Sequence, residues 1–275
     1  MNVPDSMLAS YPHIFKYLGP WLQQLSNMGG SEEYKIILNE LEGVRSGTAQ
    51  EEREPNLERL DHHLDVASRV CGNFQSLFSE KRGLGNNVEK ANEAIFDKLA
   101  EIRAIVGLHR LGFKNIKFAK TPDLLATLKG MGFLIEVTRL GASLGKRSKV
   151  WDLGIGSVES GIPMGMQVSG GKSVGTLSGA IYSKIEDKYP QLKKSIHKAD
   201  GMIVWISLGR DYLTAGRYEL PDVGLQLRMS NAKKALDLAF QQIRNTGLYS
   251  SISYVVLSRG RDNDDLISPE SNIDG

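Results

Sequence analysis

The sequence has little of what marks a secreted or a membrane protein. It has a single cysteine, Cys71, which excludes an internal disulfide framework and is typical of a reducing compartment. No apolar run is long enough to span a bilayer. The N-terminal residues lack the basic stretch and apolar core of a signal peptide. We therefore predict a cytoplasmic protein that does not associate with a membrane.

What the sequence does contain is an uneven distribution of charge. Of its 275 residues 41% are hydrophobic and 24% charged, as in an ordinary globular protein. Residues 31–61 hold nine acidic and four basic residues, whereas residues 98–149 hold eleven basic residues and only three acidic ones, a net charge of +8. Such a basic stretch favours a polyanionic partner, most commonly nucleic acid. The three acids within it, Glu101, Asp123 and Glu136, need a separate explanation.

The apolar periodicity divides the chain into a helical part and a mixed part. Residues 1–85 predict a helical N-terminal module, and residues 86–258 predict an α/β domain whose central sheet is mixed and flanked by helices. Polar residues 259–275 form a tail that we expect to be disordered. The elements expected in the α/β domain are a helix at 88–112, a strand at 115–119, a hairpin at 121–139, a helix at 180–199, a strand at 201–209, a helix at 230–247 and a strand at 251–258.

The hairpin carries two carboxylates on one face. We predict the turn within residues 129–132, as a two- or four-residue loop centred between Gly130 and Met131, which pairs Leu125 with Glu136 and Asp123 with Thr138. Asp123 and Glu136 then become diagonal neighbours, with Cβ atoms roughly 5–8 Å apart. Two carboxylates this close repel each other unless one is protonated or a cation lies between them, and a hard divalent cation, Mg²⁺ or Mn²⁺, would relieve the repulsion. The alternative is that both acids face solvent at a sheet edge and pair with basic side chains.

This hairpin, in its setting, resembles a known superfamily. The segment "TPDLLATLKGMGFLIEVTR", preceded by "LAEIRAIVGLHRLGF" and followed by "YSKIEDKYPQL" and "MIVWISLG", is similar to the PD-(D/E)XK nuclease-like superfamily over residues 88–210. Pro122 and Asp123 match the PD, and residues 136–138 match the (D/E)-X-K. The resemblance implies a restriction-endonuclease-like core, with helix, three strands, helix and strand in that order.

The resemblance also implies roles for individual residues. Asp123 and Glu136 would hold the metal, Val137 would offer its backbone carbonyl, and Glu101 on the preceding helix would contribute a further carboxylate. The alternative for Glu101 is an ordinary pair with Lys98, three residues before it on the same helix.

Thr138 departs from the superfamily pattern, because it stands where the motif has lysine. A threonine carries no charge, so it cannot stabilise the negative charge that builds on a phosphate. Members of the superfamily can take this lysine from the second core helix, where Lys184, Lys188 and Gln191 follow one helix face at i, i+4 and i+7. Either lysine is a candidate, with Gln191 helping to orient the site; a solvated helix face is the alternative. Pro190 lies inside this helix and is expected to kink it.

Together these patterns predict a Mg²⁺-dependent nuclease that acts on DNA or, less favoured, on RNA. The alternative, supported by Thr138, is a catalytically inactive module that keeps the fold and binds nucleic acid or a protein partner. A third interpretation is a structural protein whose two acids pair on the surface. The N-terminal helices are the expected surface for a partner or for self-association.

Overall fold

The computed structural model of the chain describes ten segments, separated by residues about which nothing is stated. They are residues 11–20, 56–79, 88–119, 121–140, 167–168, 172–173, 177–208, 237–241, 243–245 and 251–258. The predicted polar tail, residues 21–55 of the predicted helical module and most of residues 141–176 lie outside them. Of the helix expected at 230–247, residues 237–241 and 243–245 are described, and they are helical.

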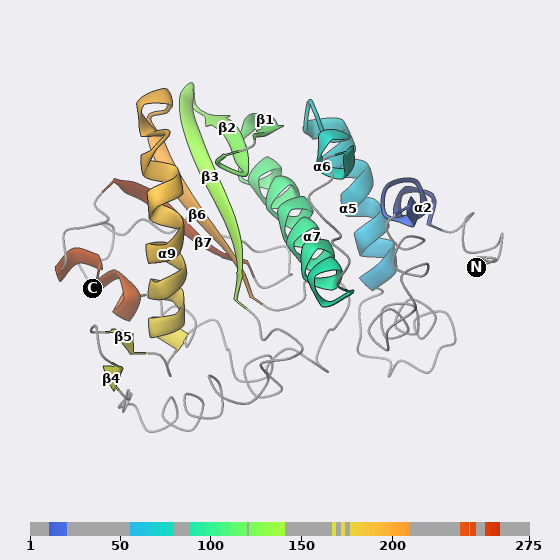
Figure 1. Cartoon of the computed structure of the whole chain (residues 1–275). Helices are drawn as coiled ribbons and strands as arrows, with labels where there is room; N and C mark the ends of the chain where they lie inside the picture. The colour runs from blue at the N-terminus through green and yellow to red at the C-terminus, as the bar shows by residue number, and fades with distance from the viewer. Residues whose placement is uncertain are drawn as a thin grey trace.

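A five-stranded mixed sheet forms the centre of the fold, with the strand order β1-β2-β3-β6-β7 (Figure 1). The antiparallel part consists of β1 (Lys114–Phe118), β2 (Leu124–Leu128) and β3 (Met131–Leu140). The parallel part adds β6 (Gly201–Leu208) to β3 and then β7 (Ile252–Ser258) to β6. The prediction of an α/β fold with a mixed sheet is therefore confirmed. The other short elements are a two-stranded ribbon of β4 (Gln167–Val168) and β5 (Lys172–Ser173), and the 3₁₀ turn η1 (Ile196–Lys198).

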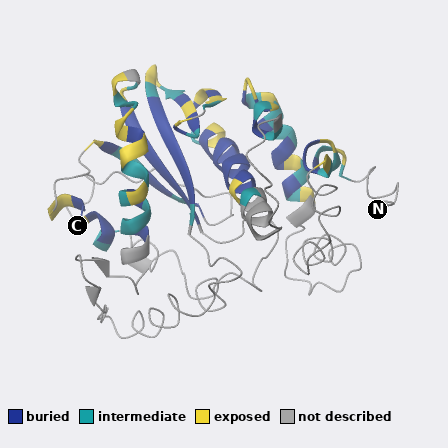
Figure 2. Cartoon of the chain, viewed as in Figure 1, coloured by how far each residue is buried: buried dark blue, intermediate teal, exposed yellow. Residues whose placement is uncertain are grey.

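Two long helices cover opposite faces of the sheet, α7 (Val88–Arg110) on one side and α9 (Leu177–Lys193) on the other (Figure 1). Alternation along β3 assigns its side chains to the two faces: Ile135 belongs to the cluster that contains α7, and Leu134 to the cluster that contains α9. Figure 2 shows the central strands almost wholly buried between these helices. The fold therefore has two apolar layers, and each residue of β3 faces one helix or the other.

The N-terminal helices α2 (Pro12–Tyr17), α5 (Asn56–Val70) and α6 (Ser76–Ser79) share one buried cluster with the sheet. They lie on the side of α7 away from the sheet (Figure 1). Within the part of the chain that the structure describes, the region predicted as a helical module thus contributes to the same core as the α/β region. In the described segments, no helix is long and apolar enough to cross a membrane.

Residues after α5 also cover the outer edge of β1. The backbone N–H of Gly72 donates to the carbonyl of Ile116 at 3.1 Å. The Asn73 side chain accepts from the N–H of Phe118 at 2.8 Å and donates to the carbonyl of the same residue at 2.9 Å. These bonds satisfy groups that an edge strand would otherwise expose for pairing with another chain.

The turn between β2 and β3 lies one residue earlier in the chain than predicted. Its turn consists of Lys129 and Gly130, both with positive φ (51° and 85°), the conformation of a two-residue turn whose twist matches the strands. The register pairs Leu128 with Met131 and Leu124 with Ile135, so the predicted centre of the turn was wrong by one residue and the predicted pairing by two positions. A shift of two leaves every side chain on its predicted face. Continued by one residue, the observed register sets Asp123 directly opposite Glu136 rather than diagonal to it.

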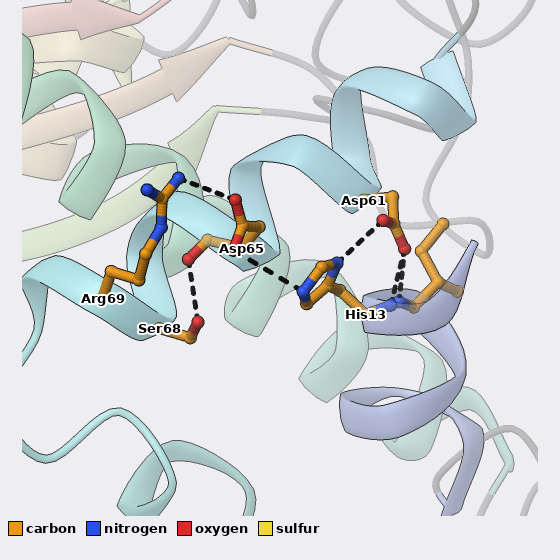
Figure 3. Close-up of polar contacts among 6 residues, drawn as sticks. His13, Asp61, Asp65, Ser68 and Arg69 are labelled. Atoms are coloured by element: carbon orange, nitrogen blue, oxygen red, sulfur yellow. Dashed lines mark hydrogen bonds and ion pairs between the residues drawn. The ribbon is translucent and has the colours of Figure 1, made fainter. Parts of the chain in front are cut away.

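A polar clasp joins α2 to α5 (Figure 3). Asp61 on α5 accepts hydrogen bonds from the backbone N–H groups of His13 and Ile14, both at 2.8 Å, and its other oxygen lies 2.9 Å from His13 Nδ1. The second ring nitrogen of His13 lies 3.5 Å from Asp65, which also pairs with Arg69 at 2.7 Å. Asp61 thus supplies the acceptors that the first N–H groups of α2 lack within their own helix.

We expect Asp61→Ala to lower the free energy of unfolding by about 1–2 kcal/mol, because it removes a helix cap and leaves two N–H groups without their acceptor. Urea unfolding followed by circular dichroism measures the change. Asp65→Ala is the matched control, since its partner Arg69 is 65% exposed and such ion pairs contribute little. Equal losses in the two variants would show that the cap on α2 adds no stability.

Candidate functional site

Glu136 is a buried carboxylate in the middle of the sheet. It follows Ile135 on β3 and so points to the α9 side, where its side chain is only 1% exposed. Lys188 of α9 donates a hydrogen bond to Glu136 Oε2 at 3.1 Å, and the lysine side chain remains 23% exposed. A charge this deeply buried is expected to be paired, and here the paired cation also reaches solvent.

Gln191 supplies the second contact from α9. With its amide nitrogen turned toward Glu136, it donates to Oε1 at 2.9 Å and to Oε2 at 3.2 Å. Pro190 lies inside α9, which nevertheless runs on to Lys193. The expected kink therefore does not prevent Lys188 and Gln191, three positions apart, from reaching the same carboxylate.

Asp123 completes the acidic pair from the residue just before β2. Its Oδ2 accepts a hydrogen bond from the backbone N–H of Val137 at 2.9 Å. This bond ties the Asp123 side chain to the strand that carries Glu136. The proximity predicted for the two acids is thus present, through the opposed register described above.

The pKa values of the site reflect this crowding. Burial, then the negative charge of Asp123, raises the pKa of Glu136 to about 8, even though Lys188 acts in the opposite direction. A hydrogen bond between the protonated Glu136 and Asp123 adds to the rise. For Lys188, burial lowers the pKa, but the charges of Glu136 and Asp123 outweigh burial and raise it overall. Lys188 therefore stays positively charged beside a carboxyl group that holds its proton unusually tightly.

The other residues that the sequence predicted for the site lie at different places relative to Asp123 and Glu136. Of the two candidate lysines, Lys188 is the one that contacts Glu136, and the half-buried Lys184 lies one turn before it on α9. Thr138 is buried on the same face of β3 as Glu136. Glu101 is buried on α7, the helix of the opposite face, and accepts hydrogen bonds from Lys98 at 3.0 and 3.1 Å. The pairing of Glu101 with Lys98 that the sequence left open is thus present.

Sequence reasoning missed Asp97. Its carboxylate pairs with Arg139 of β3 at 2.8 Å, and its charge also raises the pKa of Lys188. A signal for it existed in the sequence, because Asp97 precedes Glu101 by four residues and so shares its helix face.

The donor set suits a hard cation. Within the described segments, no three His, Cys, Asp or Glu side chains are grouped so that they could hold a metal ion. Mg²⁺, however, is commonly bound through one or two carboxylates, with water and substrate phosphate completing its coordination. Asp123 and Glu136 provide two such carboxylates, and a bound cation would offset the repulsion from Asp123 that helps to keep Glu136 protonated.

Comparisons of the chain with protein-family models, with curated proteins and with solved structures found no match.

Proposed function

We propose that the protein is a divalent-metal-dependent phosphodiesterase of the PD-(D/E)XK type that cleaves DNA or, less favoured, RNA. The observation that carries this proposal is the convergence of Asp123 and Glu136, from the β2–β3 hairpin, with Lys188 and Gln191 of α9, a helix whose Lys188 lies 52 residues beyond Glu136 in the sequence. A buried acidic pair beside a charged lysine combines the residue types that metal-assisted phosphodiester hydrolysis requires.

In this proposal Asp123 and Glu136 hold Mg²⁺ or Mn²⁺. The bound cation would lower the pKa of a water molecule and neutralise charge on the phosphate. Lys188 supplies the positive charge that Thr138 lacks, and it stabilises negative charge that develops on the substrate. Gln191 holds the Glu136 carboxylate in place through its amide. Glu101 is left out of the ligand set because it lies on α7, the helix that covers the face of the sheet opposite to Glu136.

The substrate class follows from charge. The net charge of +8 over residues 98–149 favours a nucleic acid, since exposed basic side chains such as Arg110, Lys114 and Lys117 can contact phosphates whatever the base sequence, although Lys98 and Arg103 of this stretch are buried. The single cysteine, which is buried, fits a cytoplasmic location, and the N-terminal helices are where a protein partner or a second copy would dock. Both suggestions belong to the same proposal.

The test is a cleavage assay of the purified chain on plasmid, linear and single-stranded DNA and on RNA, with Mg²⁺, Mn²⁺ or EDTA. We expect cleavage that requires the metal and that is absent from Asp123→Asn, which removes one carboxylate charge with little change in shape. Cleavage retained by Asp123→Asn would contradict the proposal. Binding without cleavage under every metal would instead favour the inactive nucleic-acid-binding module that Thr138 suggests.

A further inference from the structure

Lys188 satisfies Glu136 in the metal-free protein. Its Nζ lies 3.1 Å from Glu136 Oε2, and that carboxylate is 1% exposed, so bulk water cannot stabilise its charge. Gln191 binds both oxygens of the same carboxylate but is neutral. The ammonium group is therefore the partner that favours the ionised form of this buried acid.

A divalent cation bound to the acidic pair would need the same oxygens and would place a second positive charge beside the ammonium. Like charges this close disfavour each other, and Glu136 Oε2 cannot be fully shared by both. Lys188 has room to leave, because its side chain is 23% exposed while that of Glu136 is not. A displaced lysine would therefore move toward solvent that its side chain already reaches.

We infer that Lys188 is a built-in competitor of the metal: it occupies Glu136 until a divalent cation displaces it, and the displaced ammonium then becomes free to contact a phosphate. This inference rests on the proposed function, since it takes Asp123 and Glu136 as the metal ligands. It adds that the two roles of Lys188, pairing with Glu136 and contacting the phosphate, are coupled. When the metal binds, Lys188 is released and its positive charge becomes available to the substrate. Competition from Lys188 also weakens the affinity of the acidic pair for the metal.

The test measures binding of Mn²⁺ alone, by isothermal titration calorimetry on the full chain without nucleic acid. Lys188→Met removes the charge and keeps the length of the side chain. We expect it to bind Mn²⁺ at least about tenfold more tightly than the wild type, as expected when a like charge is removed from within hydrogen-bonding distance. Lys194→Met, an exposed position just beyond α9, is the matched control and should bind as the wild type does. Lys188→Gln, which can still donate a hydrogen bond to Glu136, is the second variant if Lys188→Met does not fold.

The outcomes separate this inference from the proposed function. Equal or weaker Mn²⁺ binding by both Lys188 variants overturns the inference, and the cleavage assay on the wild type then decides the function independently. Tighter binding by the variants supports the inference even if the wild type cleaves no substrate. No Mn²⁺ binding by the wild type or by either Lys188 variant overturns the inference and the metal site of the proposed function together.

Discussion

Lys188→Ala is expected to lose metal-dependent cleavage by about 10²–10³-fold, the usual cost of removing one group that stabilises charge in a transition state. This loss is expected because of where Lys188 lies. Lys188 is the lysine of α9 that contacts Glu136, and Thr138, at the motif position, carries no charge. The measurement is the initial rate of cleavage at saturating Mn²⁺, so that a change in metal affinity does not mask the loss.

Two further variants make this result specific to the charge of Lys188. Lys184→Ala removes a lysine one turn away on α9 and should keep most of the activity. Lys188→Arg retains the positive charge and should recover part of what Lys188→Ala loses, although the planar guanidinium differs in shape from the ammonium. If Lys184→Ala reduced the rate of cleavage more than Lys188→Ala, then Lys188 would not be the residue that replaces the missing motif lysine.

Glu136→Gln is expected to make the metal-free protein more stable relative to the wild type as the pH rises. In EDTA and below pH 4.5, Glu136 is protonated in both the folded and the unfolded chain and has no effect. Above that pH the unfolded chain releases the proton, whereas the folded chain retains it up to about pH 8. The wild type therefore loses stability across this window, and the glutamine variant, which does not titrate there, does not. The difference should reach a few kcal/mol and at most about 5 kcal/mol.

Urea unfolding at pH 5, 6.5 and 8 in EDTA, followed through the fluorescence of the buried Trp205, measures this difference. Mn²⁺ added at pH 8 should restore stability to the wild type and much less to the variant, because a ligand stabilises only the state that binds it. Stability curves of the two proteins that run parallel from pH 5 to pH 8 would show that Glu136 titrates normally in the folded chain.

The sequence alone determined the fold class and the shared face of the two acids. Alternation along the hairpin follows from the period of two in a strand, so Asp123 and Glu136 share a face whether the turn holds two residues or four. The turn itself was predicted wrongly. The four residues "KGMG" can form a two-residue or a four-residue turn. The structure has the two-residue turn, at Lys129 and Gly130, both in the left-handed conformation.

Tertiary packing decided what local patterns left open. Helical periodicity puts Lys184, Lys188 and Gln191 on one face, but how α9 lies on the sheet determines which lysine meets Glu136. In the same way, α7 covers the opposite face of the sheet, where Glu101 pairs with Lys98 and Asp97 with Arg139. The periodicity of neighbouring residues determines which face of one helix or strand each side chain lies on. The distances between elements arise only when their apolar faces pack together, and here that packing raised the pKa of Glu136 and paired it with Lys188.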